Sequence, residues 1–596
     1  MKITLGGWLM VAAYFLFNLL IGLYFRKKGT ESTNDYFVSG RNVSWWLAGT
    51  SMVAATFSAD TPLAVTGLVA TQGIAGNWLW WGLLLSGMMT VFCFARLWRR
   101  AEIVTDVEFV ELRYSGKPAA FLRGFRALYF GVLMNCLILG WVNLAMEKIL
   151  MTVLGVSESW ALAIIFAIIA FTGFYTFISG LWGVLWTDFF QFILKMSMVI
   201  VLACYGVRAV GGMKSLFAKL AVVDAARRAA HHGGAGSILS FIPSFSSPWM
   251  PFVTFFVCVG VNWWANWYPG AAPGGDGYIA QRIFSAKDEK HSLWATLWFN
   301  IAQYAIRPWP WIVTALVSVA LYPHLQDPEI GYVKVWVDHL PQALGGLMLA
   351  AFAAAYMSTI ATQLNWGSSY LINDLYRRFM VKGRNEAHYV TMSQMATVLL
   401  ALAGAAVSLI MTSVAGAWQL LLAIGAGTGT VYLLRWYWWR INAWSEISSM
   451  AAALLTTVAL HAGFHLSDST PRGFAESVLI TVAVTSAIWL AVTFLTAPEP
   501  EDKLLEFYRR VRPSAAGWQH IAALATGMTP ARDGWRNIGD WLLGSAMVYL
   551  AMFGVGRLIL GPHWVGCIYL LVSAACGYAI YWDFSRRGWE TFSGRK

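Results

Sequence analysis

The chain has 596 residues, of which 58% are hydrophobic and 12% are charged, whereas an average soluble protein has roughly 25% charged residues. This composition excludes a large soluble core and predicts an integral membrane protein. The formal net charge of +12 comes from basic clusters between apolar segments, a pattern that sets membrane topology and does not form a nucleic-acid-binding face. The six cysteines are scattered in or beside apolar segments, and no pair has metal-ligand spacing.

Apolar segments recur along the whole chain and predict about fifteen transmembrane helices, each near the length that crosses a bilayer. The first segment has no basic n-region and no cleavage site, so it is interpreted as a span and not as a removed signal peptide. In chain order the predicted spans lie near residues 4–25, 44–70, 76–97, 124–153, 158–178, 184–208, 249–269, 291–322, 343–375, 388–412, 416–439, 443–466, 474–497, 540–560 and 563–583.

Basic residues concentrate in alternate loops, which by the positive-inside rule predicts an external N-terminus and a cytoplasmic C-terminus. The loop after the first span, for example, contains Arg26, Lys27, Lys28 and Arg41. The loop 210–248 is external in this scheme although it contains four basic residues, whose weight is reduced by the length of the loop. This pattern favours a bacterial inner membrane, with a eukaryotic plasma membrane as the alternative.

Four ionisable residues stand out within predicted spans, where charge is costly and usually functional. Asp60 interrupts the second span, Asp188 and Lys195 lie seven residues apart on the sixth, and Arg307 lies near the middle of the eighth. The alternative for each is a structural ion pair or a side chain that extends to the membrane surface.

Two spans contain helix-breaking sequences, "SADTP" in the second and "NWWANWYPGAAPGGDG" at the end of the seventh. Broken helices expose backbone carbonyls that coordinate ions and solutes in transporters. Because the breaks are five helices apart, they predict two inverted five-helix repeats. The predicted division is a leading helix and loop (1–43), a first repeat (44–209), an external loop (210–248), a second repeat (249–440) and additional C-terminal helices with a cytoplasmic segment (441–596).

The ninth span, "AAFAAAYMSTIATQLNWGSSYLIND", combines small residues with Ser358, Thr359 and Thr362. Small residues allow another helix to approach closely, and hydroxyl oxygens suit a small, hard cation. The alternative is a packing face whose hydroxyls bond back to their own helix.

Four ordered motifs point to one family: "DYFVSGRNVSWW", "YTFISGLWGVLWTDFFQ", "YIAQRIFSAKDEK" and "MSTIATQLNWGSSYLINDLY". With these motifs most of residues 1–440 resembles the sodium/solute symporters, which include sodium/glucose, sodium/proline and sodium/sialic acid carriers. The resemblance implies an all-α membrane fold with the inverted-repeat core of the leucine-transporter type, in agreement with the two breaks.

The resemblance also implies a sodium site between the first and eighth core helices. Its ligands would be the backbone carbonyls of Ala54, Phe57 and Ala355 and the hydroxyls of Ser358 and Thr359. We call this the first cation position.

Some members of the family bind a second sodium, for which the matching residues here are Asp188 and Thr362. Ala361 replaces one hydroxyl of that site, and Lys195 brings a positive charge that competes with a cation. We therefore expect one sodium ion per cycle.

For the solute, the resemblance implies a pocket in which an arginine suits a carboxylate or pairs with Asp60 and leaves a neutral polyol as the substrate. The matching positions are Thr56, Asp60, Thr61, Asn266, Arg307 and Gln419.

The expected function is sodium-coupled import of a small polar organic solute, a sugar or polyol or a carboxylate, by alternating access. The expected partners are the solute, sodium and the lipid bilayer, with no nucleic acid, for a monomer or homodimer. A membrane sensor built on a transporter fold is the alternative. A membrane-embedded enzyme has less support because no loop contains a cluster with catalytic spacing.

Overall fold

The computed structural model describes residues 3–29, 32–230, 236–264, 274–409, 425, 427–463, 466, 470–531 and 533–587. Within these ranges the chain is helical, and the strand-like pairing is an isolated bridge between Val43 and Ala286. The helices of the N-terminal half are α1 (Leu5–Gly29), α2 (Thr33–Val38), η1 (Ser39–Arg41), α3 (Trp45–Thr56), α4 (Asp60–Gln72), η2 (Ile74–Asn77), α5 (Trp78–Trp81), α6 (Leu84–Met89), η3 (Thr90–Phe94), α7 (Ala95–Ala101), α8 (Phe109–Arg113), α9 (Gly116–Leu128), η4 (Tyr129–Met134), α10 (Asn135–Leu154), α11 (Glu158–Val210) and α12 (Met213–Ala230).

The C-terminal half is built in the same way, with short π segments continuing several α-helices. Its helices are α13 (Phe252–Phe256), η5 (Val257–Val261), η6 (Asn262–Trp264), α14 (Gly277–Ser285), α15 (Glu289–Asn300), η7 (Ile301–Ile306), α16 (Pro308–Leu321), η8 (Pro328–Ile330), α17 (Gly331–His339), α18 (Gln342–Ser369), η9 (Tyr370–Met380), α19 (Glu386–Ser408), α21 (Gly429–Tyr437), α22 (Ala443–Val458), η10 (Ala459–Gly463), α23 (Pro471–Leu495), α24 (Glu501–Val511), η11 (Ala515–Gly517), α25 (Gln519–Leu524), α26 (Gly534–Leu560) and α27 (His563–Arg587).

Among the described residues, 10 helices are long and apolar enough to cross a membrane, or up to 11 if a bent pair counts as one span. The all-helical membrane fold is therefore confirmed, whereas the expected fifteen spans are not. Parts of the predicted spans 249–269 and 416–439 lie outside the described residues. The orientation of the termini and the division into repeats stay predictions.

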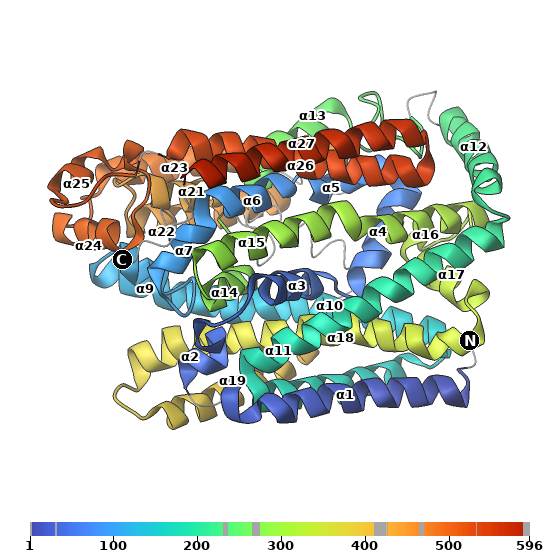
Figure 1. Ribbon diagram of the computed structural model, residues 1–596, viewed down its shortest axis with the longest axis horizontal. Coiled ribbons are helices and arrows are strands. Elements are labelled where there is room, and N and C mark those ends of the chain that lie inside the picture. Colours follow the sequence, from blue (N-terminus) through green and yellow to red (C-terminus); the bar gives the residue numbers. More distant parts are fainter. Residues whose placement is uncertain are drawn as a thin grey trace.

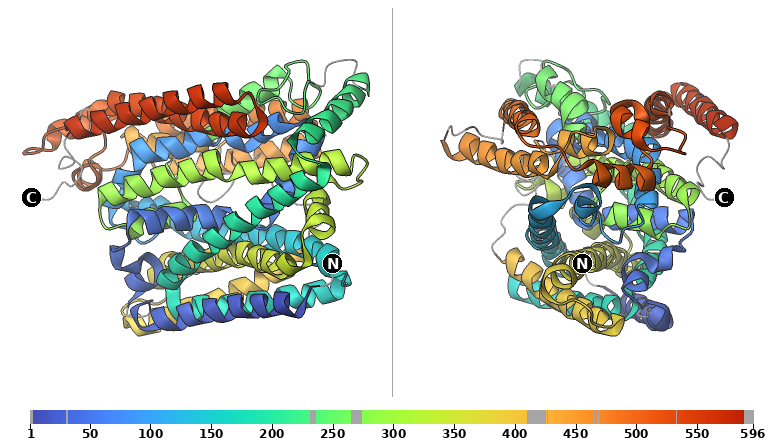
Figure 2. Two further views of the ribbon diagram at one scale, coloured as in Figure 1. Left: turned by 45° about the vertical axis from the view of Figure 1, so that its right-hand side comes forward. Right: turned by 90° about the vertical axis from the view of Figure 1, so that its left-hand side faces the viewer.

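The long helices run roughly parallel along the molecule (Figure 1). α3, α11, α16 and α18 form its middle, with α1 and α19 on one side and α26 and α27 on the opposite side (Figures 1 and 2). α1 packs on both α11 and α18, and α11 packs on α3, α16 and α18. The middle of the bundle is therefore where the predicted site residues can meet.

Helix α11 contains 53 residues, which at 1.5 Å per residue is about 80 Å, far more than the roughly 30 Å of a bilayer core. Gly180 divides it, with φ 56° and ψ −154°, a conformation that essentially only glycine adopts. The two arms are seen in Figure 2. They correspond to the predicted spans 158–178 and 184–208.

The predicted break in the second span is the junction of α3 and α4, which are bent by 59° relative to each other. Phe57, which ends α3, has φ −89° and ψ 74°. Pro62 is the third residue of α4, where its missing N–H costs nothing because the first four N–H groups of a helix have no intrahelical partner. A continuous helix would instead lose a hydrogen bond at this proline.

A buried charge cluster, the Glu446 cluster, joins α22 to the rest of the bundle. Glu446 forms ion pairs with Arg126 at 3.0 Å and Arg435 at 3.3 Å, and the Tyr114 hydroxyl donates to its carboxylate at 2.6 Å. All four side chains are buried. Two arginines and a hydroxyl thus surround one carboxylate on a helix outside the predicted repeats.

Candidate functional site

The last turn of α3 presents its backbone carbonyls to the second arm of α11. The Lys195 ammonium on that arm donates to the Ala54 carbonyl at 2.8 Å and to the Phe57 carbonyl at 3.1 Å. Lys195 is 1% exposed, and its Nζ lies 5.0 Å from the centroid of the Phe57 ring. A side-chain cation therefore contacts two of the oxygens predicted to bind sodium.

Helix α18 contributes the other predicted ligands of the first cation position. The Thr359 hydroxyl lies 3.2 Å from the carbonyl of Ala55 and 3.2 Å from that of Ala355, so it links α18 to the end of α3. The neighbouring Ser358 hydroxyl instead donates to Asp188 at 2.6 Å. The structure thus brings the predicted helices together, with Ser358 directed to the carboxylate of α11.

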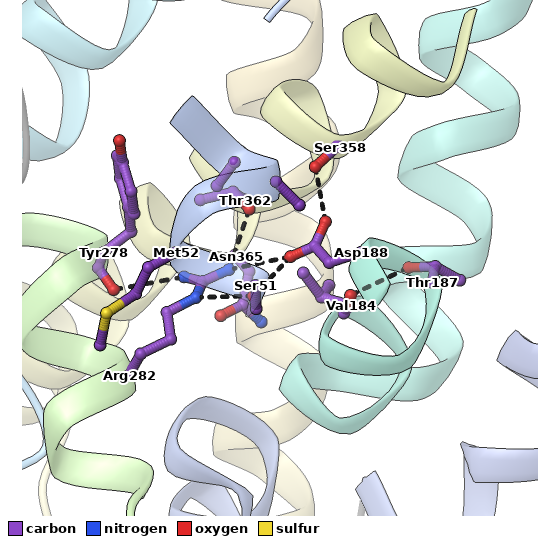
Figure 3. Close-up of polar contacts among 12 residues, drawn as sticks. Ser51, Met52, Val184, Thr187, Asp188, Tyr278, Arg282, Ser358, Thr362 and Asn365 are labelled. Carbon is purple, nitrogen blue, oxygen red and sulfur yellow. Dashed lines mark hydrogen bonds and ion pairs between the residues drawn. The ribbon is translucent and has the colours of Figure 1, made fainter. Parts of the chain in front are cut away.

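Asp188 is surrounded by hydrogen-bond donors from three other helices (Figure 3). Its carboxylate accepts from Ser51 of α3 at 2.5 Å as well as from Ser358, and it lies 3.6 Å from the Arg282 guanidinium of α14. Arg282 also donates to Thr362 at 2.9 Å. The guanidinium therefore bridges the two residues predicted for a second sodium.

The solute residues that the structure describes gather beside the break. The Arg307 guanidinium donates to the Val53 carbonyl at 3.2 Å and to the Thr56 hydroxyl at 2.9 Å. The Thr56 hydroxyl in turn donates to the Gln303 amide oxygen at 2.8 Å. Arg307 is thereby fixed against α3, which the sequence did not predict.

Asp60 begins α4 and is 3% exposed. Its Oδ1 atom is buried and has no hydrogen-bond partner among the described residues, which is unusual because buried polar atoms are generally paired. Thr61 follows it and is half-buried. Asn266 and Gln419 lie outside the described residues.

Arg307 is held by an irregular stretch of helix. Its backbone N–H donates to the carbonyl of Ala302, five residues back, at 3.0 Å, the pattern of a π turn, which is frequent at functional sites. Pro308 follows and begins α16. The guanidinium also lies over the ring of Trp311, 4.9 Å from its centroid, so ring and backbone together orient it.

Sequence reasoning missed three residues of this site: Ser51, Arg282 and Gln303. Gln303 lies four residues before Arg307, a spacing that places two side chains on one helical face, so this signal was available. Arg282 lies in a quoted motif, but its partner Asp188 is distant in the sequence. Ser51 has no local signal.

Comparisons with known proteins agree with this architecture. A sequence model of the Sodium:solute symporter family matches residues 36–452. A sodium/glucose cotransporter of Vibrio parahaemolyticus is 26% identical over 521 residues, which cover 83% of this chain and 91% of the relative. A sodium/proline symporter of Staphylococcus aureus is 24% identical over 509 residues, covering 80% and 92%.

A solved structure of a Na+-coupled sialic acid symporter, in a substrate-bound outward-open state, superposes with a TM-score of 0.63 at 18% sequence identity. The match covers 84% of this chain and 100% of that chain. The two proteins therefore share a fold.

Proposed function

Because the chain belongs to the sodium:solute symporter family, we propose that it is a secondary active symporter that imports a small polar organic solute by alternating access. The observation that carries the proposal is the polar cluster at the α3–α4 break, where Asp60 and Arg307 are buried beside unwound backbone. Family membership and the relatives support sodium as the coupling ion. They also do not favour a membrane sensor.

The proposed solute is a sugar or polyol, or a carboxylate. The buried Asp60 Oδ1 atom without a hydrogen-bond partner suits a hydroxyl donor of a polyol. A guanidinium, with five N–H donors in a planar fork, suits a carboxylate. The two residues thus favour different solutes, and both classes belong in the assay.

The proposed sodium ligands are the carbonyls of Ala54, Phe57 and Ala355 with the hydroxyls of Ser358 and Thr359. Sodium held there ties α3 to α18 across the break, which organises the solute pocket. We propose one sodium ion per cycle, because Arg282 bridges Asp188 and Thr362, the residues that match the family's second sodium site.

Inward movement of one positive charge across 100 mV supplies about 2.3 kcal/mol. That free energy is available for solute accumulation when the inverted-repeat core moves relative to the surrounding helices. We propose a bacterial inner membrane as the location and a monomer or homodimer as the assembly.

The test is uptake into proteoliposomes of a panel of labelled sugars, polyols, amino acids and carboxylates, with an inward sodium gradient or with choline in place of sodium. We expect concentrative uptake of one chemical class under the gradient. Equal uptake in protein-free liposomes for every compound would refute the proposal.

A further inference from the structure

We infer that the Lys195 ammonium is a tethered competitor of the coupling cation. The side chain and a sodium ion are alternative occupants of the first cation position, between the carbonyls of Ala54 and Phe57. The inference rests on the proposed symport and identifies a residue that sets its ion affinity.

The contacts at the end of α3 oppose simultaneous occupancy by sodium and the ammonium. Lys195 Nζ lies 2.8 Å from the Ala54 oxygen and 3.1 Å from the Phe57 oxygen, ordinary lengths for N–H···O hydrogen bonds. Because the ammonium is charged, these bonds are of the stronger, charge-assisted kind. A sodium ion coordinated by the same two oxygens would replace these hydrogen bonds or bring a second positive charge next to Nζ.

The surroundings hold the ammonium at this place. Lys195 is 1% exposed, and the second arm of α11 packs on α3, so the two carbonyls replace the water that an exposed ammonium would bind. The face of the Phe57 ring adds a cation–π contact at 5.0 Å. Lys195 is thus hydrogen-bonded to the carbonyls at the α3–α4 break and does not extend to the membrane surface.

The charges around the break also oppose a second occupant. Among the buried charged side chains of the α3–α4 break and of the Asp188 site, two are carboxylates, Asp60 and Asp188, and three are cations, Lys195, Arg282 and Arg307. These five groups carry one surplus positive charge before any ion binds. Because buried charges are poorly screened, adding sodium while the ammonium stays in place would raise the surplus to two.

The lysine ammonium is carried at the end of a flexible four-carbon stem, so it can leave the carbonyls without a backbone movement. A tethered group has a high effective concentration at its site, and sodium must displace it to bind. We therefore expect the wild-type protein to bind sodium weakly and to keep the end of α3 linked to α11 when sodium is absent.

The test measures sodium binding to the purified full-length protein in detergent, without any solute. Thermal unfolding is followed while sodium chloride replaces choline chloride at constant ionic strength, because a ligand of the folded state raises the unfolding midpoint with its concentration. The variants are Lys195→Met, which removes the charge, and Lys195→Arg, which keeps it. Lys148→Met is the matched control, since Lys148 pairs with Asp327 and Glu329 and not with the carbonyls that end α3.

We expect the sodium dissociation constant, fitted from the rise of the unfolding midpoint with sodium concentration, to be at least tenfold lower in Lys195→Met than in the wild type. Lys195→Arg and Lys148→Met should behave as the wild type does. If Lys195→Met does not fold, Lys195→Gln replaces it, because the amide removes the charge and still donates hydrogen bonds. An unchanged or weaker sodium response in the uncharged variants overturns the inference. The outcome is independent of the uptake panel, so failure of the proposed solute transport is recognised separately.

Discussion

Two buried groups of charges differ in how completely their carboxylates are paired. In the Glu446 cluster one carboxylate accepts from two arginines and a tyrosine. Around the α3–α4 break, the Lys195 ammonium bonds to backbone carbonyls, and one oxygen of Asp60 has no hydrogen-bond partner among the described residues. The first arrangement suits a fixed joint between helices, whereas the second leaves groups to which a ligand can bind.

Burial of charge therefore has two separate uses in this chain. A buried carboxylate that accepts all its hydrogen bonds is costly to remove, because its partners are then left buried without an opposite charge. A buried carboxyl oxygen without a hydrogen-bond partner already lowers the stability of the folded protein. A solute that donates a hydrogen bond to it removes this penalty, which favours binding of the solute. Mutations in the two regions should therefore affect different measurements.

The largest expected effect is on stability, from Glu446→Ala. Two buried arginines would lose their carboxylate, which destabilises a protein by about 3–5 kcal/mol. The measurement is an unfolding titration in detergent micelles. Glu476→Ala is the control, because Glu476 pairs with Arg472 at 2.7 Å on exposed side chains, and such a pair contributes only about 0.3–0.5 kcal/mol. Equal losses in the two variants would contradict the comparison.

Ser358→Ala should act on transport. It removes a donor to Asp188 and a proposed sodium ligand, so we expect sodium-dependent uptake to fall about a hundredfold, equivalent to about 2.7 kcal/mol, while the protein stays folded. Ser369→Ala is the control on the same helix, since Ser369 bonds back to the Trp366 carbonyl at 2.6 Å. Sodium-dependent uptake at the wild-type rate in Ser358→Ala would exclude Ser358 from the cation position.

Tyr114→Phe tests the Glu446 cluster with a smaller change. The hydroxyl donates to a buried carboxylate at 2.6 Å, and a hydrogen bond to a charged group is worth about 1.5–3 kcal/mol. Tyr432→Phe is the matched control, because the buried Tyr432 hydroxyl has no hydrogen-bond partner among the described residues. Unfolding titrations should separate the two variants, and a greater loss for Tyr432→Phe would refute the pairing.

The smallest effect is expected from Asp60→Asn, which removes a charge but keeps the size of the side chain. We expect the solute half-saturation constant to rise about fivefold, or about 1 kcal/mol, with a smaller change in the sodium constant. Uptake at varied solute and varied sodium gives both constants. A larger change for sodium would place Asp60 with the ion and not with the solute.

Local sequence was sufficient for the all-helical membrane fold and for the break, whereas the expected fifteen spans are not confirmed. Pro62 and the short polar stretch before it disfavour a continuous helix wherever they occur, and Gly180 falls between two apolar segments of spanning length. The partner of Lys195 was not predictable, because Ala54 is 141 residues away in the chain and only packing brings the two together. The sequence suggested that Lys195 competes at Asp188, whereas the structure places its ammonium at the first cation position.

The bend at Gly180 has a mechanical consequence. A β-carbon at this glycine would lie 2.9 Å from the backbone oxygen of Tyr36, so the short helix α2 packs directly against the bend. α2 is in turn fastened to the start of α19, where the Thr33 hydroxyl donates to Glu386 at 2.7 Å. The bend of α11 is therefore in direct contact with a third element, and we expect any motion that changes the angle between the two arms to carry α2 along or to break its hydrogen bond to α19.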